Sequence, residues 1–117
     1  MSTSDSARIA RAYFDAWSSK KGTEVLRPLM AEGFSFSAGE MHVEGRDNFL
    51  AGGNWPDGAV TTLIAEAYDG EHGFQLYSAV NGNKVVRIVE YLTVRDGVVV
   101  ASEIITDQNQ FMAFMTG

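Results

Sequence analysis

Three Asx-Gly dipeptides divide the second half of the chain into segments of similar character. They are Asp69-Gly70, Asn81-Gly82 and Asp96-Gly97, and they separate runs rich in β-branched and aromatic residues. The four runs are 60–68, 74–80, 84–95 and 98–106. An Asx-Gly pair between such runs is the strongest local signal for a β-hairpin, because a type I′ turn needs two residues with positive φ. This half is therefore predicted to be an antiparallel meander.

The N-terminal segment has the periodicity of an amphipathic helix. Ile9, Tyr13 and Trp17 recur at helical spacing, which predicts a helix over residues 4–19. Residues 20–22, Lys-Lys-Gly, should end it, because positive charge suits a helix C-terminus and glycine accommodates a left-handed cap.

Shorter elements connect this helix to the meander. A short helix, partly 3₁₀, is expected over 23–30, because Pro28 lacks a backbone N–H. Strands at 34–37 and 41–43 follow, and a third helix begins at Asp47.

Helices followed by antiparallel strands define an α+β architecture, and 117 residues suit one domain over 1–117. The apolar tail, 111–115, is expected to fold back as a lid.

Composition excludes several classes of function. The net charge is −6 and the nine basic residues are scattered, which disfavours nucleic-acid binding. There is no cysteine, so disulfides and thiolate chemistry are excluded. His42 and His72 lie in no cluster of potential ligands, and we expect neither a metal nor a cofactor. With no signal peptide and no membrane-length apolar run, we expect a cytoplasmic protein without membrane partners.

The last hairpin carries the most informative polar residues. If Asp96-Gly97 forms a two-residue loop, Glu90 lies directly opposite Glu103, and Asp107 lies further along the same face. Like charges in that position destabilise a sheet, and apolar neighbours disfavour ionisation. A carboxyl group pushed toward neutrality can serve as a general acid or base. We therefore predict Glu90, Glu103 and Asp107 as catalytic residues.

An alternative register leads to a different outcome. A β-bulge near Ser102 would shift the pairing and turn Glu103 outward. The acids would then be solvated or salt-bridged groups without function.

Both faces of this hairpin are largely apolar, whereas a sheet with one wet face alternates cleanly between apolar and polar residues. The helices can cover one face. A second copy of the chain is expected to cover the other, which predicts a homodimer through the outer sheet face.

Aromatic residues supply the candidates for a ligand pocket, although aromatic stripes also occur in ordinary cores. The predicted ligand-binding residues are Tyr13, Trp17, Phe34, Phe36, Trp55, Tyr68, Tyr77, Phe111 and Phe114.

Five short segments, in order along the chain, carry a resemblance to a known superfamily. They are YFDAW at 13–17, PLM at 28–30, FSF at 34–36, EGRDNF at 44–49, and VEYLTVRDG at 89–97 leading to Thr106-Asp107. Their order and spacing over all 117 residues resemble the nuclear transport factor 2-like superfamily, and within it the SnoaL-like polyketide cyclases and ketosteroid isomerase relatives.

The resemblance implies a cone-shaped (cystatin-like) α+β roll, in which a curved sheet wraps round the long helix and which commonly dimerises. It places Asp107 where SnoaL-like cyclases and limonene-epoxide-hydrolase-like enzymes have a catalytic acid, and Glu90 at a frequent acidic position. The base of ketosteroid isomerases would fall near Phe36, which cannot take a proton. The Arg-x-Asp of the epoxide hydrolases and the cyclase histidine are absent from 75–79. None of the three reactions is therefore assigned.

We expect a pocket for a small apolar ligand that carries a carbonyl or hydroxyl group. The chemistry would be of isomerase, cyclase or hydrolase type, with Asp107 transferring a proton, Glu90 and Glu103 tuning it, and Tyr77 or Tyr68 orienting the substrate. The alternative is a non-catalytic ligand-binding or dimerisation module of the same fold.

Overall fold

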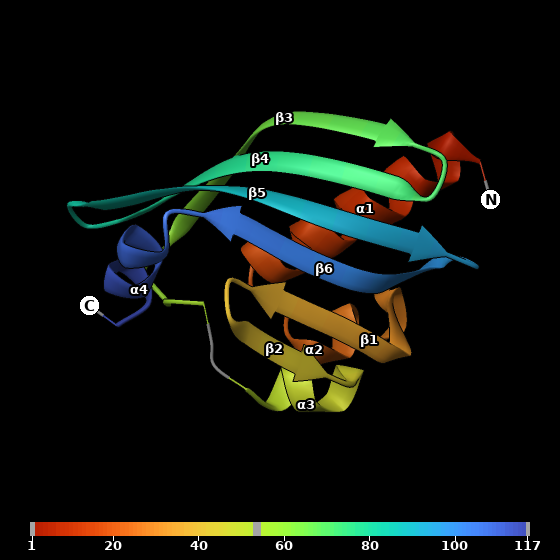
Figure 1. Cartoon of the computed structure of the whole chain (residues 1–117), viewed down its shortest axis with the longest axis horizontal. Helices are drawn as coiled ribbons and strands as arrows, with labels where there is room; N and C mark the ends of the chain where they lie inside the picture. Colours follow the sequence, from red (N-terminus) through yellow and green to blue (C-terminus); the bar gives the residue numbers. More distant parts are fainter. Residues whose placement is uncertain (1, 53–54, 117) are drawn as a thin grey trace.

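Six strands form one curved sheet, and helix α1 lies across its inner face (Figure 1). The computed structural model describes residues 2–52 and 55–116. The helices are α1 Thr3–Ser18, α2 Thr23–Leu26, the 3₁₀ helix η1 Arg27–Leu29, α3 Arg46–Ala51 and α4 Gln108–Thr116. The strands are β1 Met30–Ala38, β2 Met41–Glu44, β3 Val60–Asp69, β4 His72–Asn81, β5 Lys84–Arg95 and β6 Val98–Thr106.

The sheet has the order β2-β1-β6-β5-β4-β3, and only the β1–β6 pair among these neighbours is parallel. The predicted α+β roll with a mainly antiparallel sheet is confirmed. Register shifts occur in three strand pairs: β1–β6, β3–β4 and β5–β6. Bulges bend a strand and increase its local twist, so these irregularities help the sheet to curl round α1.

Helix α1 begins and ends one residue earlier than the expected 4–19. The Ser2 side chain accepts a hydrogen bond of 3.1 Å from the Asp5 N–H. At the other end the residue with positive φ that follows the helix directly is Lys20, at 55°, and not the expected Gly22. Gly22, with φ 95° and ψ 166°, instead precedes α2. The Lys21 N–H then donates to the Ala16 carbonyl at 3.0 Å, which satisfies one of the last carbonyls of the helix.

The three hairpins form as predicted, but two of their loops lie one residue further along. Asp96-Gly97 is a loop of two positive-φ residues, at 53° and 84°. By contrast, Asp69 pairs with His72 and Asn81 pairs with Lys84, so each Asx residue remains in its strand. In both, glycine alone supplies the positive φ and starts the loop.

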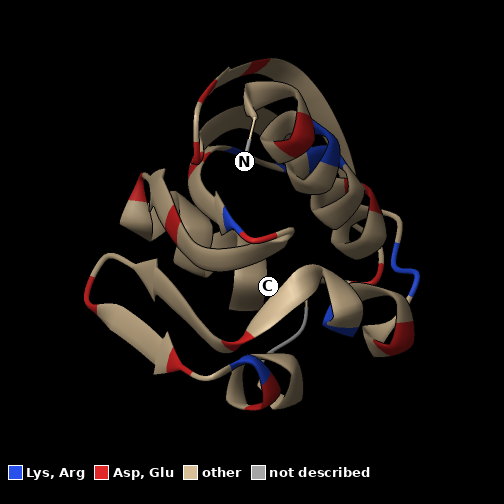
Figure 2. Ribbon diagram, turned by 90° about the vertical axis from the view of Figure 1, so that its right-hand side faces the viewer, with Lys and Arg blue, Asp and Glu red and all other residues tan. Residues whose placement is uncertain are grey.

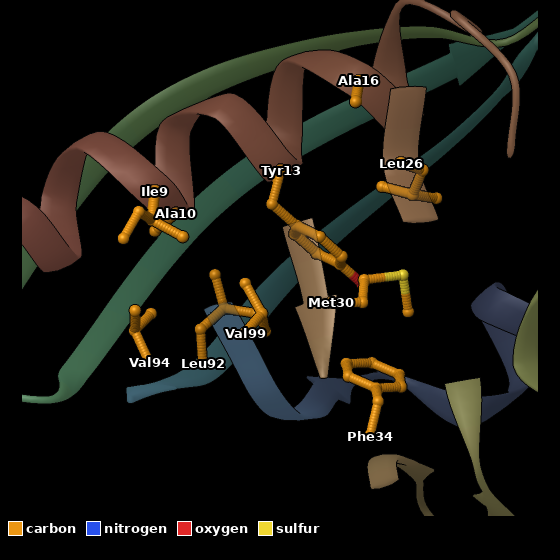
Figure 3. Packing of buried hydrophobic residues seen from close by; sticks show 10 residues of the cluster. All are labelled: Ile9, Ala10, Tyr13, Ala16, Leu26, Met30, Phe34, Leu92, Val94 and Val99. Carbon is orange, nitrogen blue, oxygen red and sulfur yellow. The ribbon is translucent and has the colours of Figure 1, made fainter. Parts of the chain in front are cut away.

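The main core lies between α1 and the inner face of the sheet (Figure 3). Ala10, Phe34, Leu92, Val94 and Val99 have no exposed surface. Figure 3 shows Val94, Leu92 and Val99 lying close to Ile9 and Ala10 of the helix, with Tyr13 further along. This packing fixes the helix over the sheet.

Charged residues are dispersed over helices, strands and loops (Figure 2). Acidic residues outnumber basic ones, 15 to 9. Over the described ranges 2–52 and 55–116, no helix has the length and apolar character needed to cross a bilayer.

Truncating a core valine should test the assigned packing. Val99→Ala removes two buried methyl groups and should lower the free energy of unfolding by about 2 kcal/mol. Val25, on α2, is 44% exposed, so Val25→Ala should change it by less than about 0.5 kcal/mol. Urea denaturation of both variants makes the comparison, and equal effects would contradict the assigned core.

Candidate functional site

A cavity of about 520 Å³ lies between the C-terminal part of α1, the inner sheet face, α3 and α4. Its volume falls in the range typical of small-molecule sites. Six of the nine aromatic residues predicted to contact a ligand line it: Tyr13, Trp17, Phe36, Trp55, Tyr77 and Phe111. Aliphatic side chains and methionines make up much of the remaining wall.

The other three aromatic residues are not among the lining residues. Phe34 is fully buried against Tyr13 and Phe49, with ring centroids 6.4 and 5.1 Å away. Phe114 packs behind Trp55 at 5.1 Å. Tyr68 lies on the inner face near the N-terminal half of α1, where Arg11 covers its ring. The predicted substrate-orienting role of Tyr68 therefore has no support from its position.

The expected pairing of Glu90 with Glu103 does not form. Val94 pairs with Val99 but Thr93 pairs with Ala101, so Val100 is an extra residue in β6. This is the bulge near Ser102 that formed the alternative register. Beyond it Glu90 faces Ile104, and Glu103 faces Tyr91 on the outer side of the sheet.

The predicted shared face of three acids is therefore wrong. Glu103 and Asp107 are both exposed and neither lines the cavity. Asp107 instead begins α4, because its side chain accepts from the Gln110 N–H at 2.9 Å. Asp107 thus has a structural role as the cap of α4, and Glu103 is a solvent-exposed residue on the outer face.

Glu90 is the acid that reaches the cavity. It lines the cavity, and its exposed fraction is only 2%. The Tyr77 hydroxyl donates to one carboxyl oxygen at 3.0 Å, and the Ser102 hydroxyl donates to the other at 2.5 Å. Burial raises the pKa of Glu90 above its ordinary value, while these two hydrogen bonds partly oppose the shift. A carboxyl group whose pKa is raised in this way holds a proton to higher pH than an exposed carboxyl group does.

Two neutral phenols accompany this acid. Burial raises the pKa of Tyr77 and of Tyr13 well above the ordinary value, and the charge on Glu90 adds to both shifts. Tyr13 belongs to α1 and Tyr77 to β4, so Glu90 has one phenol from the helix and one from the sheet near it. Both residues also line the cavity, where a hydroxyl group can bond to a polar atom of a ligand.

Sequence reasoning missed Ser102, because the regular hairpin register places it on the opposite face from Glu90. The signal for its true position is the run Val98-Val99-Val100, which lacks polar alternation and so fits a bulge. Gln75 was also missed. It is a polar residue inside an apolar strand, it is fully buried, and it lies directly opposite Glu90.

The aromatic wall of the cavity contains both tryptophans of the chain. Trp17 packs edge-on against Trp55 and Tyr77, with ring centroids 5.4 and 5.2 Å away. The Trp55 indole N–H donates to Thr61 at 3.1 Å, which orients that ring. Such edge-to-face packing fixes ring positions and gives the wall a defined shape.

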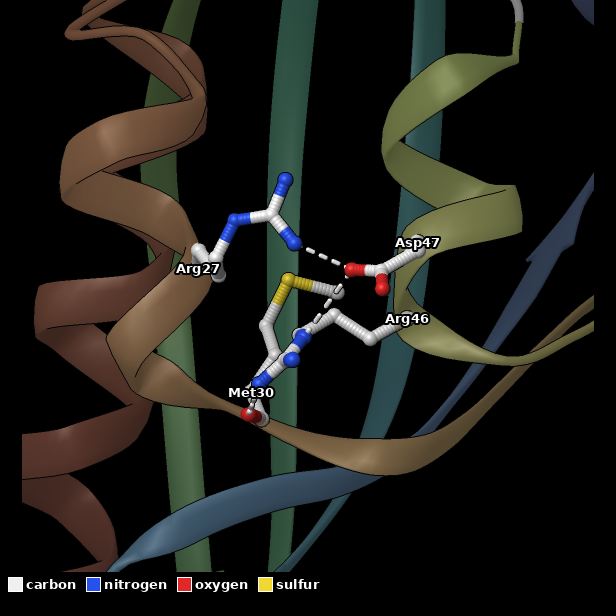
Figure 4. A network of polar contacts seen from close by, with 4 residues as sticks. All are labelled: Arg27, Met30, Arg46 and Asp47. Atoms are coloured by element: carbon white, nitrogen blue, oxygen red, sulfur yellow. Dashed lines mark hydrogen bonds and ion pairs between the residues drawn. The ribbon is translucent and has the colours of Figure 1, made fainter.

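A charged network holds α3 beside η1 (Figure 4). Asp47 bonds to both Arg27 and Arg46, and Arg46 also donates to the Met30 carbonyl at 3.4 Å. The hydrogen bond from Arg46, together with the pairing to Arg27, lowers the pKa of Asp47. The network positions Phe49 and Leu50 of α3, which line the cavity.

Among the described residues, no three His, Asp or Glu side chains lie close enough together to hold a metal ion. Glu90 and its neighbouring hydroxyl groups are polar groups at the cavity, and Lys20 and Asp57 line it as well.

No family profile matches the sequence, and no curated protein matches it. Solved structures do match. A proposed ketosteroid isomerase from Kribbella flavida DSM 17836 has a TM-score of 0.81 at 22% identity, over 90% of this chain and 79% of that chain. A proposed SnoaL-like polyketide cyclase from Jannaschia sp. CCS1 has a TM-score of 0.79 at 18% identity, over 98% and 94%.

A nuclear transport factor 2-like protein of unknown function from Mesorhizobium loti also has a TM-score of 0.79 at 18% identity, over 90% of this chain and 93% of that chain. At these identities the similarity establishes the fold. The resemblance seen in the sequence is confirmed at that level.

The raised pKa of Glu90 predicts a specific pH dependence of stability. Because the folded state holds this proton more tightly than the unfolded chain, the stabilisation is complete below the ordinary pKa of 4.5. It is lost as the pH rises through the folded-state pKa, by about 1.4 kcal/mol per pH unit in that window. Glu90→Gln cannot titrate, so wild type should lose stability relative to this variant over the same window. Denaturant titrations at several pH values measure the difference.

Glu40→Gln is the matched control, because Glu40 is exposed in the turn between β1 and β2. Its stability relative to wild type should vary little over the same pH range. Parallel pH profiles for wild type and Glu90→Gln would contradict the raised pKa.

Proposed function

The chain has the fold of the nuclear transport factor 2-like proteins, and we propose that its cavity binds a small apolar molecule carrying a carbonyl or hydroxyl group. Glu90 transfers a proton to or from that molecule in a reaction of isomerase or cyclase type. The observation that carries the proposal is a buried carboxyl group on the cavity wall, held by Tyr77 and Ser102.

The composition of the wall supports the ligand class. Trp17, Trp55, Phe36 and Phe111 offer flat apolar surfaces, and few polar groups interrupt them. Polar groups at the inner end then fix the orientation of the ligand, because apolar contact alone does not distinguish one end of a molecule from the other. An oxygen atom of the ligand would lie toward Glu90 and Tyr13.

The proposed chemistry follows from the state of the acid. In its neutral form Glu90 donates a proton to a ligand oxygen, and in its ionised form it removes a proton from carbon next to a carbonyl group. Burial brings the two forms closer in free energy near neutral pH than they are for an exposed carboxyl group. Tyr77 and Ser102 hold the carboxyl group in one orientation throughout. Neither Asp107 nor Glu103 takes part, because neither lies at the cavity.

Replacing the acid should separate binding from turnover. Glu90→Gln keeps the shape of the side chain but removes its proton transfer, so turnover should fall at least 100-fold while ligand binding changes less than tenfold. A Δ5-3-ketosteroid and a panel of smaller apolar ketones are suitable test compounds. Binding is followed by tryptophan fluorescence, because both tryptophans line the cavity.

Glu103→Gln is the control and should retain wild-type binding and turnover, because its side chain is exposed and faces away from the cavity. Binding without turnover in every variant, wild type included, would favour the alternative of a non-catalytic binding module. Equal loss of turnover in both variants would contradict the role of Glu90.

We also propose that two copies of the chain associate through the outer face of the sheet. That face carries exposed apolar side chains in adjacent strands, among them Phe74, Val85 and Ile105, which are 45%, 55% and 54% exposed. Phe74 stacks on Tyr91 with ring centroids 4.8 Å apart, which gives the face a flat aromatic patch. Arg87 and Glu103 lie on the same face. Several exposed apolar side chains on one sheet face are typical of an interaction surface.

A charge on this face should prevent the association. Sedimentation velocity at micromolar concentration should give a dimer for wild type and a monomer for Val85→Glu, because a buried unpaired carboxylate is costly at an interface. Val25→Glu, at a 44% exposed position on α2, is the matched control and should remain dimeric. A wild-type monomer would overturn the proposal.

A further inference from the structure

A chain of hydrogen bonds runs along the inner face of the sheet from the surface toward Glu90. The Arg11 guanidinium of α1 donates to Glu66 of β3 at 2.7 Å. The Tyr68 hydroxyl donates to the same carboxylate oxygen at 2.8 Å. The Gln75 amide of β4 then donates to the Tyr68 oxygen at 3.0 Å.

The direction of these bonds is set at the outer end. The hydrogen bond from Arg11 lowers the pKa of Glu66, which therefore remains a carboxylate and can only accept. Burial raises the pKa of Tyr68 to about 12, so its hydroxyl keeps its one proton and uses it on Glu66. The Tyr68 oxygen can then only accept, and Gln75 must present its NH₂ group to it.

This orientation leaves the Gln75 carbonyl oxygen for another donor. The side chain is fully buried, and that oxygen has no hydrogen-bond partner among the described residues. Gln75 is directly opposite Glu90 in the β4–β5 ladder, and both side chains lie on the inner face. The Cβ atoms of directly opposite residues are about 4.5–5.5 Å apart, so the two side chains are within reach of each other.

We propose that Gln75 is a positioning residue whose carbonyl oxygen accepts a hydrogen bond from protonated Glu90, so that the Arg11–Glu66 ion pair at the surface selects the neutral form of the acid in the cavity. A protonated carboxyl group supplies one donor and still accepts from Tyr77 and Ser102. In the ligand-free protein that donor goes to Gln75, and the oxygen atom of a bound ligand would take it over from Gln75. The inference rests on the proposed function for its relevance to proton transfer.

The other groups that face Glu90 supply no competing charge. They are Tyr13 from α1, Tyr77 from β4 and Ser102 from β6, and the two phenols are neutral because burial raises the pKa of each. Among the ion pairs of the described residues, none includes Glu90. Ionising Glu90 would set a carboxylate beside the Gln75 carbonyl, and turning the amide would break its bond to Tyr68.

A glycine beneath Tyr68 makes room for this hydrogen-bonded chain. The Tyr68 ring lies over Gly73, and a Cβ atom there would come within 2.9 Å of two ring carbons. Glycine at this position therefore allows Tyr68 to lie flat on the sheet and to reach Gln75.

Tyr68→Phe tests the inference without changing any charge. It removes the group that orients the amide, so the NH₂ group of Gln75 can turn and donate to the Glu90 carboxylate. The pKa of Glu90 should fall by at least one unit, a tenfold increase in its ionisation constant. The infrared carbonyl band of the protonated carboxyl group, followed against pH in the ligand-free full-length protein, measures this value. Loss of the band in Glu90→Gln assigns it.

Glu66→Gln provides a second route at an exposed position. Its amide can donate to the Tyr68 oxygen, which frees the tyrosine proton for Gln75 and reverses the chain. The pKa of Glu90 should fall in this variant too. This variant decides the matter if Tyr68→Phe does not fold.

Tyr91→Phe is the matched control. Tyr91 adjoins Glu90 in sequence, but its hydroxyl bonds to His72 on the outer face at 2.7 Å, so the pKa of Glu90 should not change. An ionised Glu90 at pH 7 in wild type, or equal pKa values in Tyr68→Phe and Tyr91→Phe, would overturn the inference. Because turnover is not measured, failure here is distinguishable from failure of the proposed function, which depends on the activity of Glu90→Gln.

Discussion

One extra residue in β6 decides which side chains meet in the cavity. Without the bulge at Val100, the regular register would place Glu103 opposite Glu90, and two carboxylates would share an apolar space. With it, Ser102 and Ile104 turn inward and Glu103 turns to solvent. The acid at the cavity therefore has hydroxyl donors rather than a second negative charge as its neighbours.

The sequence predicts the elements of this fold well because each has a local cause. The β-rich runs between Asx-Gly pairs form the strands, and the spacing of Ile9, Tyr13 and Trp17 forms α1. The exact loop residues were less predictable, because a glycine that alone supplies the positive φ can start the loop while its Asx neighbour remains in the strand.

The site was predicted only in part, because it depends on register and not on local propensity. The position of Glu90 could be predicted because buried and less buried side chains alternate along the long strand β5. The pairing of β5 with β4 has no register shift. Ser102 and Glu103 lie on the opposite faces from those predicted, because the bulge at Val100 shifts the register. Hydrophobic periodicity cannot locate a bulge inside three consecutive valines. The regular register and the resemblance both place Asp107 among catalytic acids, whereas in the structure its side chain caps α4.

The parallel pairing of β1 with β6 has a consequence for how the chain folds. Phe36 pairs with Ser102 across more than half of the sequence, whereas each hairpin of the meander joins neighbouring segments. Closing a long loop costs conformational entropy before the contacts that it allows can form. Such long-range contacts therefore form late and lower the folding rate. The meander can assemble through its own short loops, but the cavity is not closed until β1 docks on β6. The cavity is thus completed by the slowest class of contact in the molecule.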